Sequence, residues 1–352
     1  MDTIFSVLKK HIDSKLPFAV YCKPGSDTIT GVFQKNNVEY STRDFFEEGF
    51  VFAPFEFEKA VLIPFNEADI ITERTDNQNI LQTEPEAVVA DGNAKSEFEF
   101  LVKKSVEKII DGNFKKVVVS RKEIIDTDKP EIELIFKKIL SLYPSAFRYC
   151  FYSKSSGMWL GATPEQLVKV NGSEINTVAL AGTQLYNDTR QAVWHDKEKQ
   201  EQQFVTDYIT ESLKNITTDS TATQPYTYRA GNLVHIKTDI SAKLKNNGLK
   251  DIINALHPTP AVCGLPKVKA KKFLKEHEGY EREYYSGFLG EINKEAATGT
   301  TGISDLFVNL RCMKIENNKV HLYIGCGITK DSDPEKEFIE TVNKSVTMRR
   351  VI

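Results

Sequence analysis

The chain has 352 residues, of which 40% are hydrophobic and 27% charged, a composition typical of a soluble globular protein with one large domain or two ordinary ones. The formal net charge of −3 argues against a nucleic-acid-binding protein, because such proteins normally carry a surplus of Lys and Arg. No run of about 18 apolar residues occurs, so the sequence predicts no transmembrane helix and no membrane partner.

The five cysteines are widely separated and none forms a CxxC pair. This arrangement predicts neither a disulfide framework nor a zinc site. The first residues also lack the basic-then-apolar order of a signal peptide. We therefore expect a reduced, cytoplasmic protein.

Residues 1–95 are expected to form a β-rich portion. One amphipathic helix is followed by short apolar runs separated by Pro, Gly and Asn, which is the pattern of strands and hairpins. These runs are 18–21, 29–33, 50–53 and 60–63. Residues 72–95 are polar and acidic, which indicates a linker or an exposed loop before the second portion, 96–352.

From residue 96 onward, helices and strands mix in larger units. Helical spacing of apolar residues predicts helices at 98–110, 131–142, 195–213, 247–256, 266–277 and 334–348. Short apolar or alternating runs predict strands at 117–120, 147–152, 157–161, 166–170, 174–180, 232–240 and 284–292. Two long strands, 305–315 and 319–328, are expected to pair as a hairpin.

The many hairpins and few strand–helix–strand alternations predict an α+β fold. We expect large, mostly antiparallel sheets that form a layered core flanked by helices. The β-rich portion 1–95 is expected to pack on the same fold as the catalytic portion 96–352.

Two residues have the character of an acid–base pair. Lys116 begins the strand 117–120, and a lysine at the head of a buried strand can lose solvation and act as a general base. A strand-end lysine more often extends to water. Glu165 follows Pro164 in a turn between two strands, where a carboxyl group in an apolar corner could keep its proton and serve as a general acid. The alternative for Glu165 is an ordinary surface turn residue.

Carboxylates with i, i+3 spacing occur on two predicted helices. Glu337 and Glu340 lie on one stripe of the C-terminal helix together with Lys344, and Glu198 and Glu201 form the second pair. Two such helices facing each other would place hard oxygen ligands around a partly open site, which suits Mg²⁺. The alternatives are a solvated face for Glu198 and a helical salt bridge between Glu340 and Lys344.

Three further residues could bind a ligand. Arg311 lies in the middle of the predicted strand 305–315, where a guanidinium between apolar neighbours needs an anionic partner from the protein or from a ligand. Tyr285 offers a hydroxyl group on the predicted strand 284–292, for a core hydrogen bond or for a ligand. His257 lies in a Pro-rich loop, where a histidine more often anchors the loop than catalyses a reaction.

Several short motifs occur in order along residues 96–352. They are Lys116-Val-Val-Val-Ser-Arg121, Gly161-Ala-Thr-Pro-Glu165, Leu180-Ala-Gly-Thr183, Lys197-Glu-x-x-Glu201, His257-Pro-Thr-Pro-Ala-Val262, Glu281-Arg-Glu-Tyr-Tyr-Ser-Gly287, Gly325-Cys-Gly-Ile328 and Asp333-Pro-Glu-x-Glu-x-x-Glu340-Thr-x-x-Lys344. Together they resemble the chorismate-utilising enzymes, which include isochorismate synthase, salicylate synthase, anthranilate synthase component I and aminodeoxychorismate synthase component I. The resemblance implies the fold of that family.

Two positions discriminate within the family. Members that add ammonia to chorismate carry glutamine where this chain has Lys116, whereas members that add water carry lysine there. Aminodeoxychorismate synthases carry a nucleophilic lysine where this chain has Ala181. The chain therefore looks like a water-adding member, isochorismate synthase first and salicylate synthase second. It departs from the family at Gln202, where histidine is usual.

The resemblance implies a mechanism for converting chorismate to isochorismate. Lys116 would activate water for attack at C2, and Glu165 would protonate the departing C4 hydroxyl on the opposite face of the ring. Glu201 and Glu340 would hold a Mg²⁺ that binds the ring carboxylate, with Glu198 and Glu337 placed to orient its waters.

The resemblance also implies substrate contacts and partners. Chorismate would be contacted by Ala181, Gly182, Thr183, His257, Tyr285, Arg311, Gly325, Gly327 and Lys344. Because Lys116 argues against the ammonia-adding class, no obligatory glutaminase partner is expected, and a monomer is expected. The product would serve menaquinone or siderophore biosynthesis.

Overall fold

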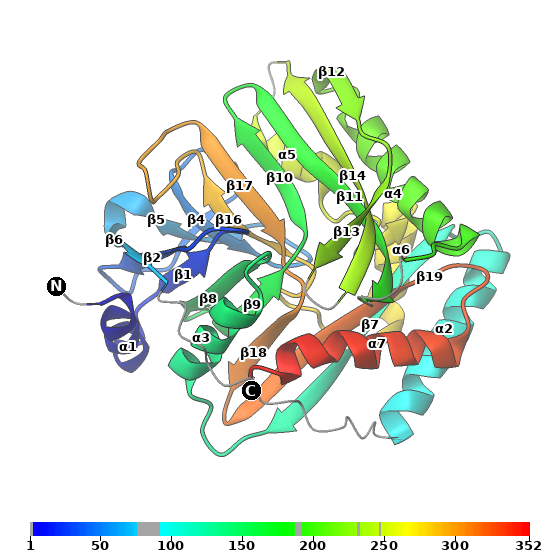
Figure 1. The fold of residues 1–352 in the computed structure, drawn as a ribbon, viewed down its shortest axis with the longest axis horizontal. Helices are drawn as coiled ribbons and strands as arrows, with labels where there is room; N and C mark the ends of the chain where they lie inside the picture. Colours follow the sequence, from blue (N-terminus) through cyan, green and yellow to red (C-terminus); the bar gives the residue numbers. More distant parts are fainter. Residues whose placement is uncertain (1–2, 76–91, 187–191, 231–232, 246–247) are drawn as a thin grey trace.

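The computed structural model describes residues 3–75, 92–186, 192–230, 233–245 and 248–352 (Figure 1). Within these ranges, two large antiparallel sheets face each other, and helices cover their outer faces. The predicted α+β class with layered antiparallel sheets is confirmed. No helix in the described ranges has both the length and the apolar character needed to cross a bilayer.

The first sheet has nine strands in the described part of the chain. In spatial order they are β15 (Gly264–Leu265), β7 (Lys116–Asp126), β19 (Lys319–Ile328), β18 (Cys312–Glu316), β9 (Gly157–Thr163), β8 (Phe147–Ser153), β1 (Phe18–Cys22), β2 (Thr28–Gln34) and β6 (Ala68–Arg74). Every residue of β1 is buried, because both faces of the sheet are covered there.

The second sheet has ten strands within the described ranges. In spatial order they are β12 (Thr217–Ala222), β14 (Leu233–Leu244), β11 (Glu174–Leu185), β10 (Gln166–Asn171), β17 (Ile303–Val308), β16 (Phe288–Ile292), β4 (Gly49–Ala53), β5 (Ala60–Pro64) and β3 (Tyr40–Thr42), and β13 (Tyr226–Ala230) also pairs with β14. Strands from the first 74 residues thus extend both sheets. The domain boundary at residue 95 stays a prediction.

The helices form three groups. Helices α1 (Ile4–Ser14) and α3 (Ile132–Leu142) cover the first sheet, and α4 (Asp196–Leu213) and α5 (Leu249–Leu256) cover the second. Helices α2 (Gly92–Ile110), α6 (Lys267–His277) and α7 (Pro334–Arg349) pack around β7 and β19, and a 3₁₀ turn, η1, spans Phe65–Glu67. In Figure 1, α7 (red) runs past β7 and β19 and meets α2 (cyan).

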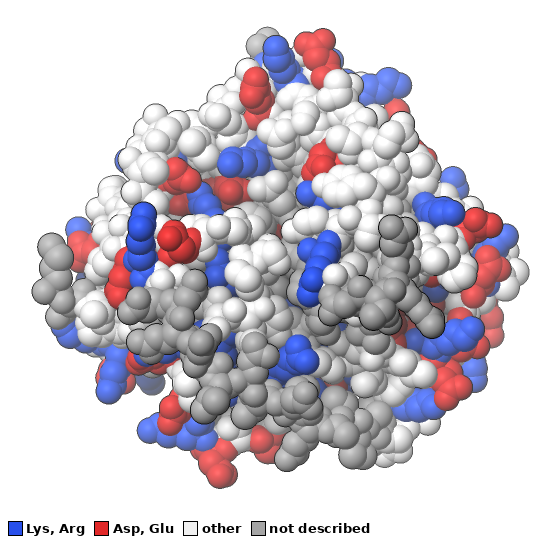
Figure 2. Space-filling model, viewed as in Figure 1, with Lys and Arg blue, Asp and Glu red and all other residues white. Residues whose placement is uncertain are grey.

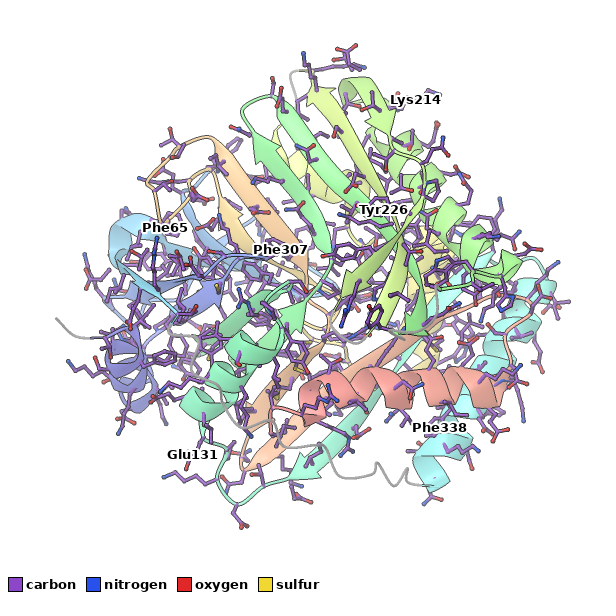
Figure 3. All side chains as sticks on the ribbon, in the orientation of Figure 1. Phe65, Glu131, Lys214, Tyr226, Phe307 and Phe338 are labelled. Carbon is purple, nitrogen blue, oxygen red and sulfur yellow. The ribbon has the colours of Figure 1, made fainter. Side chains whose placement is uncertain are left out.

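Local sequence explains why α7 begins where it does. The side chain of Asp333 accepts a hydrogen bond from the amide of Lys336, and Pro334 occupies the first helical position. Both features are favoured helix-start signals. Phe338 then anchors the helix in the apolar cluster shared with α2 (Figure 3).

Aromatic side chains fill the space between the two sheets. Phe307 of β17, labelled near the centre of Figure 3, stacks on Phe147 of β8 with ring centroids 4.3 Å apart. Large aromatic side chains give much apolar burial per residue, so this layer fixes one sheet against the other.

The structure differs from the prediction at the strand 305–315. The segment is two strands, β17 and β18, which belong to different sheets and are separated by residues 309–311. Buried Asn309 holds this crossing, because its amide oxygen accepts from the hydroxyl of Tyr149 and its amide nitrogen donates to the carbonyl of Tyr284. The hairpin partner of β19 is β18 alone.

Other predicted elements differ less. Strand β16 begins at Phe288, so Tyr285 lies in the preceding turn rather than on a strand. Strands β12 and β13 were not predicted; β12 consists almost entirely of polar residues and lacks an apolar alternation. The predicted linker 72–95 is wrong at both ends, because β6 continues to Arg74 and α2 begins at Gly92, and its residues 76–91 lie outside the described residues.

Candidate active site

A pocket lies where β7, β19, β11, α4 and α7 meet the crossings between the sheets. The predicted residues that line it are Glu165, Ala181, Gly182, Glu201, Tyr285, Arg311, Gly325, Gly327, Glu340 and Lys344. Residues distant in the chain therefore come together as the motif set predicts. The roles assigned to them stay predictions.

Lys116 lies directly behind the wall of this pocket. Its side chain is fully buried, and its Nζ is 2.8 Å from Oε1 of Glu201 on α4. Its Cε is 3.1 Å from the position that a Cβ on Gly327 would occupy. Lys116 therefore does not extend to water. Its side chain passes Gly327, and its ammonium group contacts Glu201, which lines the pocket.

Glu165 is a buried acid on the pocket wall. It follows β9 and precedes β10, at the point where the chain passes from the first sheet to the second, and its exposed fraction is 5%. Burial raises the pKa of Glu165 to about 7, against the opposing attraction of Lys116, Arg311 and Lys344. A carboxyl group with this pKa carries a proton for much of the time at neutral pH.

Two glycines of β19 keep the pocket open. A Cβ on Gly327 would lie 2.2 Å from Oε1 of Glu201. A Cβ on Gly325 would lie 2.7 Å from the hydroxyl oxygen of Tyr285 and 2.8 Å from the carbonyl oxygen of Val119. These distances are shorter than normal contacts. At Gly325 the backbone carbonyl of Val119 cannot move aside, whereas at Gly327 the carboxylate of Glu201 would have to shift.

Three lysines pair with the predicted metal-ligating carboxylates. Lys116 pairs with Glu201, and Lys344 pairs with Glu340 on the same helix at 2.6 Å. Lys344 also donates to the carbonyl of Gly325 at 3.0 Å.

The third pair joins α4 to α7. Lys197 of α4 donates to Oε1 of Glu337 at 2.5 Å. Burial disfavours the charge of Lys197, but the attraction of Glu337, and then of Glu201 and Glu340, raises the pKa of Lys197 overall.

Glu337 lies beneath the pocket wall and is 2% exposed. Its Oε2 makes no hydrogen bond of normal geometry with the described residues. Burial, and then repulsion by Glu340, raises the pKa of Glu337. The side chain of Ser332 donates to the same carboxylate and works against this rise.

The donor set fits Mg²⁺. Glu201 and Glu340 present carboxylates to the same pocket from two different helices, and Glu337 lies one helical turn before Glu340 on α7. Among the residues that the structure describes, no three His, Cys, Asp or Glu side chains form a ready-made metal cage. Mg²⁺ usually keeps several waters and takes one or two protein carboxylates together with substrate oxygens.

Arg311 lies in the break between β17 and β18, with a φ of 47°. Burial lowers the pKa of Arg311, and no carboxylate in the described part of the chain lies within ion-pair distance of it. The sequence left two possible anionic partners for Arg311, a carboxylate of the protein or one of a ligand. The described residues do not supply the first.

Tyr285 ends a stack of aromatic rings that begins in the core. Trp159 stacks on Tyr323 with centroids 5.2 Å apart, and Tyr323 stacks on Tyr285 at 5.7 Å. Burial raises the pKa of Tyr285 to about 12, so its hydroxyl group keeps its proton. The stack fixes the plane of Tyr285 beside Gly325.

Residues 180–183 form a distorted edge of the pocket. The pairing of β11 with β14 shifts register between Ala181 and Gln184, and Gly182 has a φ of +71°. The carbonyl of Gly182 contacts Nδ1 of His235 at 2.8 Å. The side chain of Thr183 lies outside the described residues.

Sequence reasoning missed His235, which lines the pocket from β14. Burial lowers the pKa of His235 to about 3, so the ring is neutral at physiological pH. The signal for it was a histidine inside the apolar run Leu233-Val234-His235-Ile236.

The structure does not bring His257 to the pocket. Its Nε2 contacts the carbonyl of Phe55 at 3.1 Å, and its ring packs against Phe57 and Phe288. The predicted substrate contact is therefore replaced by a loop anchor, and Ala261 and Val262 of the same loop line the pocket instead.

Glu198 also points elsewhere. Its carboxylate accepts from the amide of His195 at 3.0 Å and thereby caps the start of α4. Gln202, which stands where the family usually has histidine, is buried and donates to Thr238 at 2.8 Å and to Thr206 at 2.9 Å. Both side chains fix α4 against its surroundings rather than lining the pocket.

Arg282 holds two pocket walls together and was also missed. It donates to the carbonyl of Val118 at 2.6 Å and to that of Val262 at 2.7 Å. Glu278 binds the same guanidinium through both carboxylate oxygens and accepts from the amide of Ser120. Such a bidentate pair is rigid, so Arg282 positions the walls.

On the face shown in Figure 2, Lys and Arg side chains are interspersed with Asp and Glu.

The comparisons with known proteins agree with the motifs. The family model described as "Chorismate binding enzyme" matches residues 57–352. The "Salicylate biosynthesis isochorismate synthase" of Pseudomonas aeruginosa is 30% identical over 273 residues, which cover 75% of this chain and 56% of that protein. Isochorismate synthase MenF of Escherichia coli is 31% identical over 264 residues, which cover 72% of this chain and 59% of that protein.

A solved structure matches the fold over nearly the whole chain. The menaquinone-specific isochorismate synthase MenF from Escherichia coli superposes with a TM-score of 0.78 at 22% sequence identity, covering 95% of this chain and 88% of that chain. By sequence, the chain spans little more than half the length of the two relatives above.

Proposed function

The chain belongs to the chorismate-binding enzyme family, and from this premise we propose that it is an isochorismate synthase, an isomerase that converts chorismate to isochorismate. One observation carries the proposal most. Glu165, an acid with a pKa raised to about 7, shares a pocket with two carboxylates and two cationic side chains, within the electrostatic reach of Lys116. The names of the relatives in Pseudomonas aeruginosa and Escherichia coli support the same reaction.

The reaction needs a base and an acid on opposite faces of the substrate ring. In the proposed mechanism, Lys116 takes a proton from the water that attacks C2, and Glu165 donates its proton to the C4 hydroxyl as that group leaves. The double bonds shift as the C2–O bond forms and the C4–O bond breaks. A raised pKa at Glu165 supports its part, because a carboxyl group must be protonated to act as an acid.

Glu201 and Glu340 would hold the metal ion, and Glu337 would contribute from beneath the wall. When bound, Mg²⁺ supplies positive charge to the ring carboxylate of the substrate. An ion-paired lysine is an ammonium group, so Lys116 would have to give up both its contact with Glu201 and one proton before its amine could take a proton from water.

Arg311, Tyr285 and the backbone at Gly325 and Gly327 would hold the second carboxylate of chorismate. Arg311 supports this assignment because no described carboxylate pairs with it. Tyr285 adds a protonated hydroxyl group at the same wall. A bidentate guanidinium contact is the usual way to bind a carboxylate specifically.

The experiment is to incubate the protein with chorismate and Mg²⁺ and to separate the products by chromatography. Isochorismate is expected. Salicylate with pyruvate would identify a salicylate synthase, and an aminated product formed only with ammonium salts would identify the ammonia-adding class. Both of these products would overturn the proposal.

We also propose that the enzyme acts as a monomer in the cytoplasm, without a glutaminase, and that it supplies menaquinone or siderophore biosynthesis. The five cysteines are all buried and unpaired, which suits a reducing compartment. Sedimentation of the pure protein tests the first of these statements.

A further inference from the structure

The carboxylates proposed to hold Mg²⁺ are already neutralised by the protein's own cations. Lys116 pairs with Glu201 at 2.8 Å, and Lys197 pairs with Glu337 at 2.5 Å. In each pair, the positive ammonium group offsets the repulsion between that carboxylate and the other carboxylates nearby. A cation that enters the site therefore competes with charges that are built into the chain.

Lys197 differs from Lys116 and Lys344 in the element that carries it. Helix α4, which carries it, packs on β11, β14 and α5, whereas α7, which carries Glu337, packs on α2 and β19. The pair between Lys197 and Glu337 thus joins the covering helices of the two sheets. Its ammonium also faces Glu201 and Glu340, the other two carboxylates of the proposed metal site.

Lys197 is also the most exposed of the three lysines that pair with these carboxylates. Lys116 is fully buried, and Lys344 is 10% exposed and tied to Gly325. The side chain of Lys197 is 30% exposed. Its flexible four-carbon stem can therefore move its ammonium to water without unpacking the core.

We propose that Lys197 is a built-in competitor of the metal ion: its ammonium links α4 to α7 by binding Glu337, and Mg²⁺ must displace it to bind. In the metal-free protein, the lysine keeps the carboxylates paired and the two helices joined. In the metal-bound protein, the divalent ion takes over that link and Lys197 turns to solvent. Lys197 is thus a positioning residue that sets the affinity of the site for its cation.

The inference rests on the proposed magnesium site and is tested by metal binding without substrate. The variant is Lys197→Met, which keeps the stem and removes the charge. The matched control is Lys199→Met, because Lys199 is an exposed lysine on the same helix. Mg²⁺ affinity is measured by isothermal titration calorimetry, and the melting temperature is measured with and without Mg²⁺.

For Lys197→Met we expect Mg²⁺ to bind about tenfold more tightly than to the wild type, because the competing paired state is gone. Without Mg²⁺ the variant is expected to melt at a lower temperature, since Glu337 loses its partner, and saturating Mg²⁺ should raise its melting temperature by more than that of the wild type. Lys199→Met should match the wild type in both measurements.

Unchanged or weaker Mg²⁺ binding by Lys197→Met would overturn the inference, and so would equal tightening in Lys199→Met, which would reduce the effect to net charge. If the wild type itself binds no Mg²⁺, the proposed metal site fails as well. If Lys197→Met does not fold, Lys197→Arg serves instead. Arginine keeps the charge and can grip Glu337 with two donors, so this variant should bind Mg²⁺ more weakly than the wild type.

Discussion

Glu165 and Arg311 lie on two neighbouring crossings, through which the chain passes between the sheets in opposite directions. The amide of Val308 donates to the carbonyl of Glu165 at 2.9 Å, and the amide of Ala162 donates to the carbonyl of Arg311 at 3.0 Å. Because these backbone hydrogen bonds join the crossings, the buried carboxyl group of Glu165 and the guanidinium of Arg311 are held at a fixed spacing over one pocket.

Replacement of Lys116 by glutamine should abolish water addition. A general base contributes about 10²–10⁴-fold to a rate, so kcat for isochorismate formation should fall by that factor. Chromatographic product analysis measures the loss, and circular dichroism checks that the fold remains. Lys115→Gln is the control, because Lys115 is exposed. Full activity of Lys116→Gln would reject Lys116 as the base.

Activity should fall as the pH rises through about 7. Glu165 must be protonated to act as an acid, and burial raises the pKa of Glu165 to about 7. We therefore expect kcat/KM between pH 5.5 and 9 to decline on the alkaline side of that value. Glu165→Gln should lower kcat/KM about 10²–10⁴-fold. An activity that increases steadily from pH 6 to pH 8 in the wild type would contradict the assignment.

Asp305 should make stability depend on pH independently of catalysis. Burial raises the pKa of Asp305 from 3.8 to about 6, so the folded state resists ionisation more than the unfolded chain does. Stability therefore falls as the pH rises from about 4 to about 6, and the loss is complete above that range.

Asp305→Asn removes this cost. It should raise the free energy of unfolding at pH 8 by up to about 3 kcal/mol and change it little at pH 4. Urea unfolding at the two pH values measures the difference. Asp128→Asn, at an exposed position, should show no such dependence. A destabilised Asp305→Asn at pH 8 would show that the carboxylate is favoured in the folded state.

Arg311→Gln should weaken substrate binding without weakening the fold. A charge-assisted hydrogen bond contributes about 1.5–3 kcal/mol, which corresponds to a rise in KM of about 10–100-fold. The melting temperature should stay near that of the wild type, because no described carboxylate pairs with Arg311. Arg43→Gln, at an exposed position, is the control. A large loss of stability with unchanged KM would indicate a structural role instead.

Gly327→Ala should disable the site by displacing Glu201. The new Cβ would lie 2.2 Å from Oε1 of Glu201, so that carboxylate must move. A displacement of this size can cost about a hundredfold in kcat/KM, and Mg²⁺ binding should weaken in parallel. Gly92→Ala is the control, since nothing lies within 4 Å of the added atom. Wild-type metal affinity in Gly327→Ala would argue against Glu201 as a ligand.

Local patterns predict much of the fold. The helix at 334–348 was predicted from helical spacing, and the structure has α7 at Pro334–Arg349. The strand at 305–315 was wrong because Leu310 and Cys312 continue the apolar run without a glycine or proline to mark the break. The contacts of Asn309 that make the crossing come from distant parts of the chain.

The candidate site, too, could be predicted only in part. Motif order brought most of the predicted residues to one pocket, but it could not separate His235 from His257. Both histidines lie among apolar residues and both have a pKa lowered to about 3 by burial. Only the packing of the sheets decides that His235 lines the pocket and that His257 faces Phe55. Lys197 and Arg282 likewise gain their roles from partners far away in sequence.

The aromatic stack that ends at Tyr285 contains an intrinsic fluorophore, Trp159. The chain has two tryptophans, and one of them, Trp159, is fully buried at the inner end of that stack. The other, Trp194, lies just before α4 and donates to Thr227. We therefore expect occupancy of the pocket to change the intrinsic fluorescence of Trp159, and Trp194→Phe isolates the signal of the buried indole.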